Sequence, residues 1–437
     1  MPALLTTRCA MPWCLYLTMF LSLTFVSCSE YNTSSEHNIS SQQRVGALLD
    51  SDNSGGFASV HRAKEFSFPK DHGAHPDYRQ ERWQFSGNVV TGSGNQLGYE
   101  LSIQRVGLSA TTPPTAEKPP STGKGTSGNT KQSQWRSKHL YLATLSITDS
   151  NKDRFYQTEK SSRQALDMAG VHIVKATSTI NDILGDEQSQ RGTFAFNIDN
   201  WTVTSTSDEI FPLQIQVDHD DMALDLTIYP SKDIKLYGDT GLSQMGPDLG
   251  NASYYYGFNR LKTTGKITLN GLAQRIKGDS WYEHEWGTDI TGSDIQGVDR
   301  YALQFSDGRD FAFYRIRDRE NHTHPLSRGI MVFPNGEHEN VKQTDVEFEM
   351  ISEWTSPLSH IHYPISWNIR IPKYRLTIHT TPLVKEQEIH QSRTYWDGAV
   401  RVAGYQNVSS TTLKTINGYG YMQLMGYKAA VSSTSPE

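Results

Sequence analysis

Apolar and polar residues alternate in short stretches along most of the chain. In Gly98–Ile103, for example, Tyr99, Leu101 and Ile103 alternate with a glycine, a glutamate and a serine. A period of two residues is that of a β-strand, in which successive side chains point to opposite faces of a sheet. Long apolar repeats with helical spacing are absent from the sequence. We therefore expect an all-β protein, with one short helix at Ser161–Gly170 that ends at the glycine.

Turn signals separate the alternating stretches. The pairs Asp199-Asn200, Asp307-Gly308 and Asn335-Gly336 are typical of tight hairpins between antiparallel strands. The strands expected between such turns cover residues 96–106, 139–148, 192–205, 213–217, 222–229, 260–269, 272–286, 300–305, 310–317, 328–333, 341–349, 365–371, 374–379, 395–402 and 411–427.

A faint internal repeat relates the two halves of the chain. Trp83–Gly87 leading to Glu100–Arg105 resembles Leu303–Gly308 leading to Phe313–Arg317. Many short strands that occur twice predict two small antiparallel barrels from a duplicated unit. We expect one barrel in residues 61–256 and the other in residues 257–432. A barrel of about eight strands is just wide enough to hold one apolar ligand.

The first 60 residues precede the expected barrels. Residues 1–28 contain Arg8 and then an apolar run too short for a comfortable membrane span, as in an export signal. The run ends in Phe25-Val26-Ser27-Cys28, which resembles a bacterial lipoprotein cleavage box, so Cys28 is the candidate lipidated residue; an ordinary secretory signal is the alternative. Residues 29–60 have the composition of a flexible tether, and residues 109–134 that of a mobile insertion.

Composition and motifs exclude several classes of function. The formal charge of −6 gives no basic footprint, so nucleic acid is not an expected partner. Phosphate-binding loops, HExxH, CxxC and the Gly-x-Ser-x-Gly elbow are missing from the sequence. Of the 3 cysteines, Cys9 and Cys14 are removed with the signal, which leaves Cys28 and excludes an internal disulfide and cysteine catalysis.

Gly278–Gly287 is the stretch richest in chemistry. On a strand, Trp281, Glu283 and Glu285 share one face, and Tyr282, His284 and Trp286 share the other. Whichever face points inward, ionisable groups are buried beside aromatic rings, as hydrogen-bonded architecture or as a site with shifted pKa values.

A second polar group includes Asp71, His72 and His75, which lie in a loop of glycine and proline. Their spacing could suggest a metal site, but a loop does not aim both imidazoles in one direction as a helix does. We therefore interpret these histidines as hydrogen-bonded, and we expect neither a metal nor a cofactor. The neighbouring Glu81 and Arg82 are expected in a buried ion pair or at a rim.

Five motifs occur in one order along the chain. They are Phe68-Pro-x-Asp-His-Gly-x-His-Pro76, Glu81-x-Trp-x-Phe-x-Gly87, Trp281-x-x-x-Glu-Trp-Gly287, Tyr395-Trp-Asp-Gly-Ala-Val400 and Gly418-Tyr-Gly-Tyr-Met-Gln-Leu-x-Gly-Tyr427. Together they resemble the superfamily of carotenoid 1,2-hydratase (hydroxyneurosporene synthase) and AttH-like proteins, including its branch of predicted secreted hydrolases. The resemblance spans residues 66–430 and implies two lipocalin-like β-barrels in tandem.

The resemblance also implies a chemistry, the addition of water to an isoprenoid double bond. That reaction needs a carboxylic acid kept protonated by an apolar pocket, and aromatic faces that stabilise a carbocation. Asp397 is the first candidate for the acid, Glu283 and Glu285 are the second, and His284 is a further catalytic candidate. Asp397 could instead pair with Arg393 or Arg401 or cap a turn, and His284 could be a satisfied interior histidine.

Five aromatic residues are candidates for contact with the ligand; they are Trp83, Trp281, Trp286, Tyr395 and Trp396. The same rings could instead fill the barrel cores. The rival function is a lipid-anchored carrier of an apolar ligand, at the periplasmic face of a bacterial outer membrane and beside an export system. In a carrier, the polar groups only lock the two barrels together.

Overall fold

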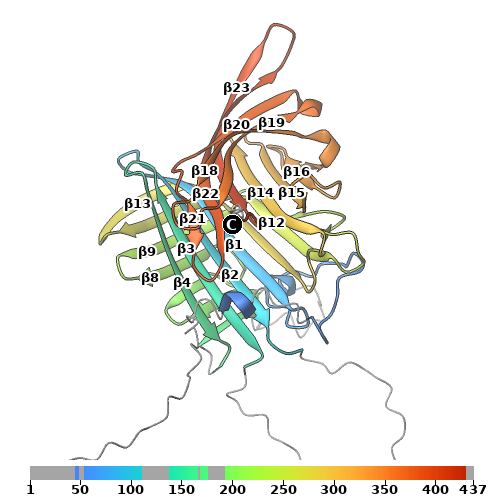
Figure 1. The fold of residues 1–437 in the computed structure, drawn as a ribbon. Helices are drawn as coiled ribbons and strands as arrows, with labels where there is room; N and C mark the ends of the chain where they lie inside the picture. Colours follow the sequence, from blue (N-terminus) through green and yellow to red (C-terminus); the bar gives the residue numbers. More distant parts are fainter. Residues whose placement is uncertain (1–44, 49–53, 111–136, 166–167, 176–191, 430–437) are drawn as a thin grey trace, which may run out of the picture. The chain divides into compact units, whose positions relative to one another are not determined.

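Antiparallel strands make up almost all of the structure (Figure 1). The computed structural model describes residues 45–48, 54–110, 137–165, 168–175 and 192–429, all within the unit Gln42–Glu437. The predicted signal segment with Cys28, most of the tether and nearly all of the insertion lie outside the described residues. Among the described residues, no helix is long and apolar enough to cross a membrane.

The first sheet has 13 strands in the order β4-β3-β2-β1-β13-β12-β9-β8-β7-β6-β5, and β10 and β11 pair with β12. Its strands are β1 (Gln80–Thr91), β2 (Gln96–Gly107), β3 (His139–Asp149), β4 (Arg154–Arg163), β5 (Ala169–Lys175), β6 (Gly192–Ile198), β7 (Trp201–Ser205), β8 (Leu213–His219), β9 (Met222–Pro230), β10 (Lys235–Leu236), β11 (Leu242–Gln244), β12 (Ala252–Leu269) and β13 (Leu272–Gly287).

The second sheet has 10 strands in the order β17-β16-β15-β14-β23-β22-β20-β19-β18, and β21 pairs with β22. Its strands are β14 (Ile295–Phe305), β15 (Asp310–Asp318), β16 (Arg328–Val332), β17 (His338–Lys342), β18 (Glu347–Thr355), β19 (His362–Ile371), β20 (Leu376–Pro382), β21 (Glu388–His390), β22 (Thr394–Asn407) and β23 (Leu413–Leu424). Single 3₁₀ turns occur at η1 (Lys70–His72), η3 (Gln343–Asp345) and η4 (Pro372–Tyr374).

Both sheets follow the same topology. In each, the first strand pairs with the second strand on one side and with the last strand on the other, as β1 does with β2 and β13, and β14 with β15 and β23. One sheet forms a nearly closed barrel and the other a half-barrel, so the predicted all-β fold class with two lipocalin-like barrels is confirmed.

Two details of the prediction differ from the structure. The change from one sheet to the other lies between Gly287 and Ile295, not at 256/257, because β12 and β13 complete the first sheet. The predicted helix at 161–170 is replaced by the end of β4 and the start of β5.

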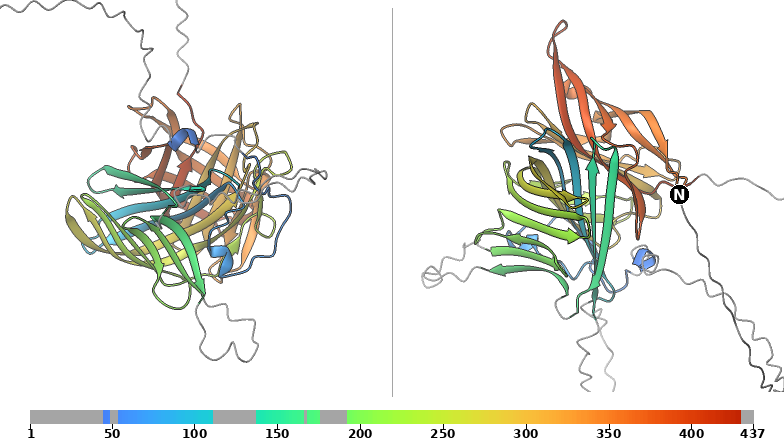
Figure 2. Two further views of the ribbon diagram at one scale, coloured as in Figure 1. Left: turned by 90° about the horizontal axis from the view of Figure 1, so that it is seen from below. Right: turned by 90° about the vertical axis from the view of Figure 1, so that its left-hand side faces the viewer.

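The central strands of the first sheet are buried on both faces. On β2, Tyr99, Leu101 and Ile103 belong to the core of the first barrel, as their alternation predicts. Glu100 and Ser102 point to the opposite face, yet they are only 3% and 2% exposed. The second sheet covers this face, as two further views show (Figure 2), so polar positions of an amphipathic strand become interior positions.

Small residues bring the two sheets close together. A Cβ atom on Gly98 would lie 2.4 Å from Cβ of Ala399, so the glycine is needed for this approach of β2 to β22. Nearby, the side-chain amide of Asn88 donates to the backbone oxygen of Gly420 at 3.1 Å. The second sheet keeps its own core on its other face, where Leu303, Trp396 and Met422 pack.

A buried ion pair joins the two sheets at one side of their junction. Asp310 on β15 of the second sheet accepts hydrogen bonds from Arg260 Nη2 and Lys232 Nζ, both at 2.6 Å. The Asp310 side chain is fully buried, whereas the exposed fractions of the two cations are 14% and 6%. Asp310 therefore pairs with Arg260 of β12 and with Lys232 of the connection between β9 and β10, and Arg260 also pairs with Asp279 at 3.0 Å.

Asp310→Asn should lower the free energy of unfolding by about 3–5 kcal/mol, because it removes the carboxylate that pairs with Lys232 and one of the two carboxylates that pair with Arg260. Chemical denaturation measures the change. Glu347→Gln is the control, since Glu347 pairs with Arg370 at the surface, and its expected effect is below about 1 kcal/mol. Equal effects of both substitutions would contradict the structural role of Asp310.

Candidate functional site

Alternation along β13 divides its ionisable residues between two environments. Trp281, Glu283 and Glu285 face the second sheet, where Trp281 joins a cluster that includes residues of β14 and β15. Tyr282 and Trp286 lie in the core of the first barrel, and His284 lies on the same side. The predicted division into two faces is confirmed, and both faces are interior.

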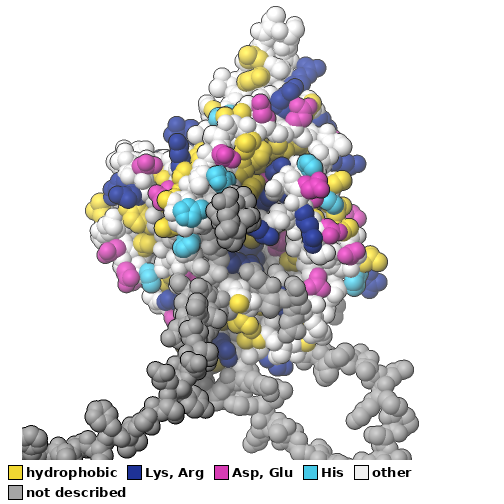
Figure 3. Space-filling view, in the orientation of Figure 1, with side chains coloured by type: hydrophobic (Ala, Val, Ile, Leu, Met, Phe, Trp, Pro, Cys, Tyr) yellow, Lys and Arg dark blue, Asp and Glu magenta, His cyan; other side chains and the backbone are white. Residues whose placement is uncertain are grey.

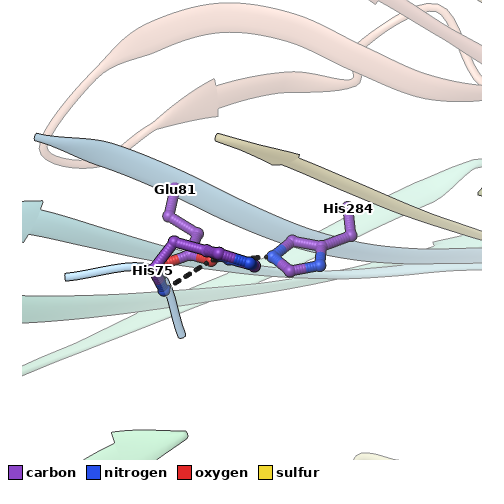
Figure 4. A group of neighbouring side chains, drawn as sticks. All are labelled: His75, Glu81 and His284. Atoms are coloured by element: carbon purple, nitrogen blue, oxygen red, sulfur yellow. Dashed lines mark hydrogen bonds and ion pairs between the residues drawn. The ribbon is translucent and has the colours of Figure 1, made fainter. Parts of the chain in front are cut away.

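The barrel side holds a hydrogen-bonded group around Glu81 (Figure 4). Oε1 of Glu81 lies 2.7 Å from Nδ1 of His75 and 2.9 Å from Nε2 of His284, and Oε2 accepts from Arg105 Nε at 2.8 Å. His75 also reaches Asp71 at 3.1 Å. The expected hydrogen-bonded histidines are therefore observed, and the ion pair of Glu81 is formed with Arg105 rather than with Arg82.

The charges of this group are set by burial and by pairing. Burial opposes the ionisation of Glu81, but Arg105 and His75 hold its pKa well below the usual range. Burial also opposes the charging of His75, but the nearby Glu81 and Asp71 raise its pKa. Burial lowers the pKa of His284 to about 4 and that of His72 to about 3, so both are neutral at physiological pH.

The same group offers ligand atoms for a metal. Atoms of His75, Glu81 and His284 all lie within 4.8 Å of one another. Their contacts are hydrogen-bond distances, however, and the guanidinium of Arg105 already supplies a cation to Glu81. We interpret the group as a charge-balanced network inside the first barrel.

The opposite face of β13 joins the two sheets through Glu285. Its Oε2 accepts from Arg300 Nη2 of β14 at 2.6 Å and from Arg82 Nη2 of β1 at 3.3 Å, and its Oε1 accepts from Ser253 at 2.8 Å. The exposed fraction of the Glu285 side chain is 4%. Arg82 also donates to Gln423 of β23 at 3.1 Å. Two guanidinium groups therefore share one carboxylate.

Glu283 lies deeper between the sheets. Its Oε1 accepts hydrogen bonds from the hydroxyl of Tyr314 at 2.8 Å and from the indole of Trp281 at 3.0 Å. Tyr314 in turn shares a hydrogen bond with the hydroxyl of Tyr255. Aromatic residues from both sheets thus hold this carboxylate.

A pair of carboxyl groups is formed by Asp397 on β22 and Glu100 on β2. The two groups share a hydrogen bond, and Asp397 Oδ2 also accepts from Gln423 at 2.8 Å. Burial raises the pKa of Asp397 to about 6, although Glu100 and Gln423 lower it by donating to the carboxylate. Burial and the negative charge of Asp397 raise the pKa of Glu100 well above the usual range. Glu100 therefore carries the shared proton.

Two adjoining cavities lie at this face. The larger has a volume of about 630 Å³ and is lined from both sheets, by Arg82 and Glu285 on one side and Tyr395 on the other. The smaller has a volume of about 20 Å³, enough for one water molecule, and Asp397 and Glu283 line it. Arg300 and Gln423 line both cavities. On the surface, hydrophobic side chains gather above Lys and Arg side chains near the centre of one view (Figure 3).

The structure brings together part of the predicted site. Asp397, Glu283, Glu285, Trp281 and Tyr395 lie between the sheets. His284, Trp83 and Trp286 lie in the first barrel, and Trp396 in the core of the second sheet; none of these four lines either of the two cavities. Asp397 contacts Gln423 and Glu100.

Sequence reasoning missed Glu100, Arg300 and Tyr314. Each occupies an alternate position of an amphipathic strand, where a polar residue is expected to face solvent. The one sequence signal for these buried polar residues was the duplication, because two barrels that pack face to face bury the outward positions of their strands. Which of these residues contact one another depends on how the two sheets pack, and the sequence does not show this.

His75→Gln should destabilise the protein in a pH-dependent manner. The folded pKa of His75 is raised, so its ionic contacts contribute fully below the unfolded pKa and are lost as pH rises through the folded pKa. The deficit of the variant should be about 1–3 kcal/mol at pH near 6 and shrink toward pH near 9. Denaturation across this range measures it, with the exposed His322→Gln as control. A deficit that grows with pH would contradict the assignment.

Comparisons with known proteins complete the description. The model of the AttH-like family matches residues 59–427. The fold is similar to that of an AttH from Nitrosomonas europaea, with a TM-score of 0.65 at 22% identity over 85% of this chain and 100% of that chain. Kievitone hydratase from Nectria haematococca gives a TM-score of 0.57 at 16% identity, over 86% of this chain and 97% of that chain.

CghA, in a structure with Sch210972, gives a TM-score of 0.50 at 11% identity over 84% of this chain and 93% of that chain. A comparison with curated proteins gives no match. Sequence identities this low show a common fold only. The family model, in contrast, matches the sequence of both sheets. The chain belongs to the AttH-like family.

Proposed function

We propose that the protein is a hydratase, which adds water to a carbon–carbon double bond of an apolar, isoprenoid-like ligand bound between the two sheets. The observation that carries the proposal is the carboxyl pair of Glu100 and Asp397, with Asp397 lining a cavity the size of one water molecule. Carotenoid 1,2-hydratase activity is one instance of this chemistry.

Asp397 has the properties of a general acid for this reaction. Its pKa of about 6 leaves about one tenth of the group protonated at pH 7, and an acid whose pKa is close to the working pH is the most effective. Glu100, with its higher pKa, donates a hydrogen bond to Asp397 and stabilises the carboxylate that forms after proton transfer.

The reaction uses Asp397 twice. The O–H bond of Asp397 breaks as a C–H bond forms at one alkene carbon, and the other carbon becomes a carbocation. Water in the small cavity attacks this carbon, and its proton passes to the Asp397 carboxylate. One water is added, and Asp397 regains its proton. Rings of Tyr314 and Tyr421 line the same cavity and can stabilise the cation.

The larger cavity fits the hydrocarbon part of such a ligand. Val106, Met245 and Val298 contribute apolar surface, and Tyr395 contributes an aromatic ring beside Asp397. The fold of kievitone hydratase, which is similar over 86% of this chain, supports the proposal that this architecture can carry hydration. That support concerns the fold, because a fold alone does not determine a reaction.

A carrier of apolar ligands is the second candidate. The contacts of Glu285 with Arg82 and Arg300 favour it, because they tie the sheets together without any need for titration. In this case we propose attachment to the outer membrane through a lipid on Cys28, beside an export system. Mass spectrometry of an organic extract separates the two functions, since a carrier returns its ligand unchanged and a hydratase returns it with one added water.

Asp397→Asn should reduce hydration by at least about a hundredfold, because an amide cannot donate a proton as a carboxylic acid does. Incubation of an extracted ligand in ¹⁸O-labelled water, followed by mass spectrometry, measures the product. The variant should remain folded, and at pH near 8 it should be up to about 3 kcal/mol more stable, because wild type loses stability as Asp397 ionises through its raised pKa. Retained turnover in a folded variant would remove Asp397 from this role.

Hydration by the wild type should fall as pH rises through about 6, because the protonated form of Asp397 is consumed. Glu100→Leu removes the hydrogen bond to the carboxylate, so the pKa of Asp397 rises and the fall in activity moves to higher pH. Glu100→Gln keeps a donor and should keep a profile close to that of wild type. Identical pH profiles of turnover in all three proteins would show that Glu100 does not tune Asp397.

A further inference from the structure

A guanidinium group with unused donors lies where the two cavities meet. Arg300 lines both the cavity of about 630 Å³ and that of about 20 Å³. Its Nη2 donates to Glu285, and its guanidinium lies 5.4 Å from the ring centroid of Tyr314 and 5.9 Å from that of Tyr255. Its Nε and Nη1 atoms are buried and have no hydrogen-bond partner among the described residues.

The neighbouring carboxylates do not satisfy these donors. The carboxylate of Glu285 is shared between Arg300 and Arg82, and from Arg300 it accepts only the Nη2 donor. Glu283 accepts from Tyr314 and Trp281 instead. A buried donor without an acceptor costs about 1–3 kcal/mol, and more when the donor is charged. The site therefore favours a ligand that supplies an oxygen acceptor.

We infer, on the basis of the hydration proposed above, that the substrate is an oxygenated alkene and not a hydrocarbon polyene. A carboxylate or carbonyl oxygen of the substrate accepts a hydrogen bond from the unused Nη1 or Nε of Arg300. Because Arg300 lines both cavities, this oxygen can lie in the larger cavity while the small cavity holds the water that attacks. The apolar wall of the larger cavity takes the remaining hydrocarbon.

Saturated probes test this recognition without any turnover. Equilibrium dialysis compares 3,7-dimethyloctanoate with the hydrocarbon 2,6-dimethyloctane on wild type and on Arg300→Gln. The wild type should bind the carboxylate at least about tenfold more tightly than the hydrocarbon, and Arg300→Gln should remove this preference, as expected for a charge-assisted hydrogen bond. Arg401→Gln, at an exposed position of the same sheet, should leave both affinities unchanged.

Three outcomes would overturn the inference: no binding of the carboxylate, no preference for it over the hydrocarbon, or an undiminished preference in Arg300→Gln. If that variant fails to fold, the two probes on wild type still decide. Hydration is measured separately with citronellate, the unsaturated counterpart of 3,7-dimethyloctanoate. If binding depends on Arg300 but no hydrated product forms, the proposed hydratase activity is refuted and the oxygenated ligand class is kept. If wild type and Arg300→Gln hydrate citronellate equally, the hydratase activity is kept and the role of Arg300 in ligand recognition is refuted.

Discussion

The burial of both faces of the central strands of the first sheet is the constraint from which the rest of the structure follows. Once the second sheet covers the outer face, polar residues at alternate strand positions lose their contact with water, and each needs a partner. Glu285 accepts hydrogen bonds from Arg82 and Arg300, and Glu283 accepts one from Tyr314. Asp397 contacts Gln423 and Glu100. The junction is therefore polar, and any ligand bound there meets shifted pKa values and directed hydrogen bonds.

Much of the fold could be predicted from local patterns. The alternation on β2 and β13, the Asp307-Gly308 turn and the repeat of one topology all follow from periods and turn chemistry that a single sequence displays. The predicted domain change at 256/257 differs from the structure because it falls inside β12 (Ala252–Leu269), and pairing of β13 with β1 assigns the strands that follow to the first barrel. Strand pairing across such a distance leaves no local mark in a sequence.

The candidate site was predictable only in part, and for the same reason. Asp397 and the Glu283–Glu285 stretch stand out through their aromatic neighbours. Glu100 and Arg300 do not, because their strands look like ordinary amphipathic strands. The Asp-His-Gly motif illustrates the opposite error: its conspicuous histidines form a network inside the first barrel with Glu81, whereas the carboxyl pair of Glu100 and Asp397 lies between the sheets.

The candidate site needs both sheets, because each sheet contributes part of its residues. Glu100 and Arg82 come from the first sheet, whereas Asp397, Gln423 and Arg300 come from the second. The carboxyl pair of Glu100 and Asp397 takes one member from each sheet, and without the other sheet each of these two carboxyl groups would be solvated and would titrate near its ordinary pKa. Packing of two similar barrels thus creates, at their junction, an acid that neither repeat could maintain in water.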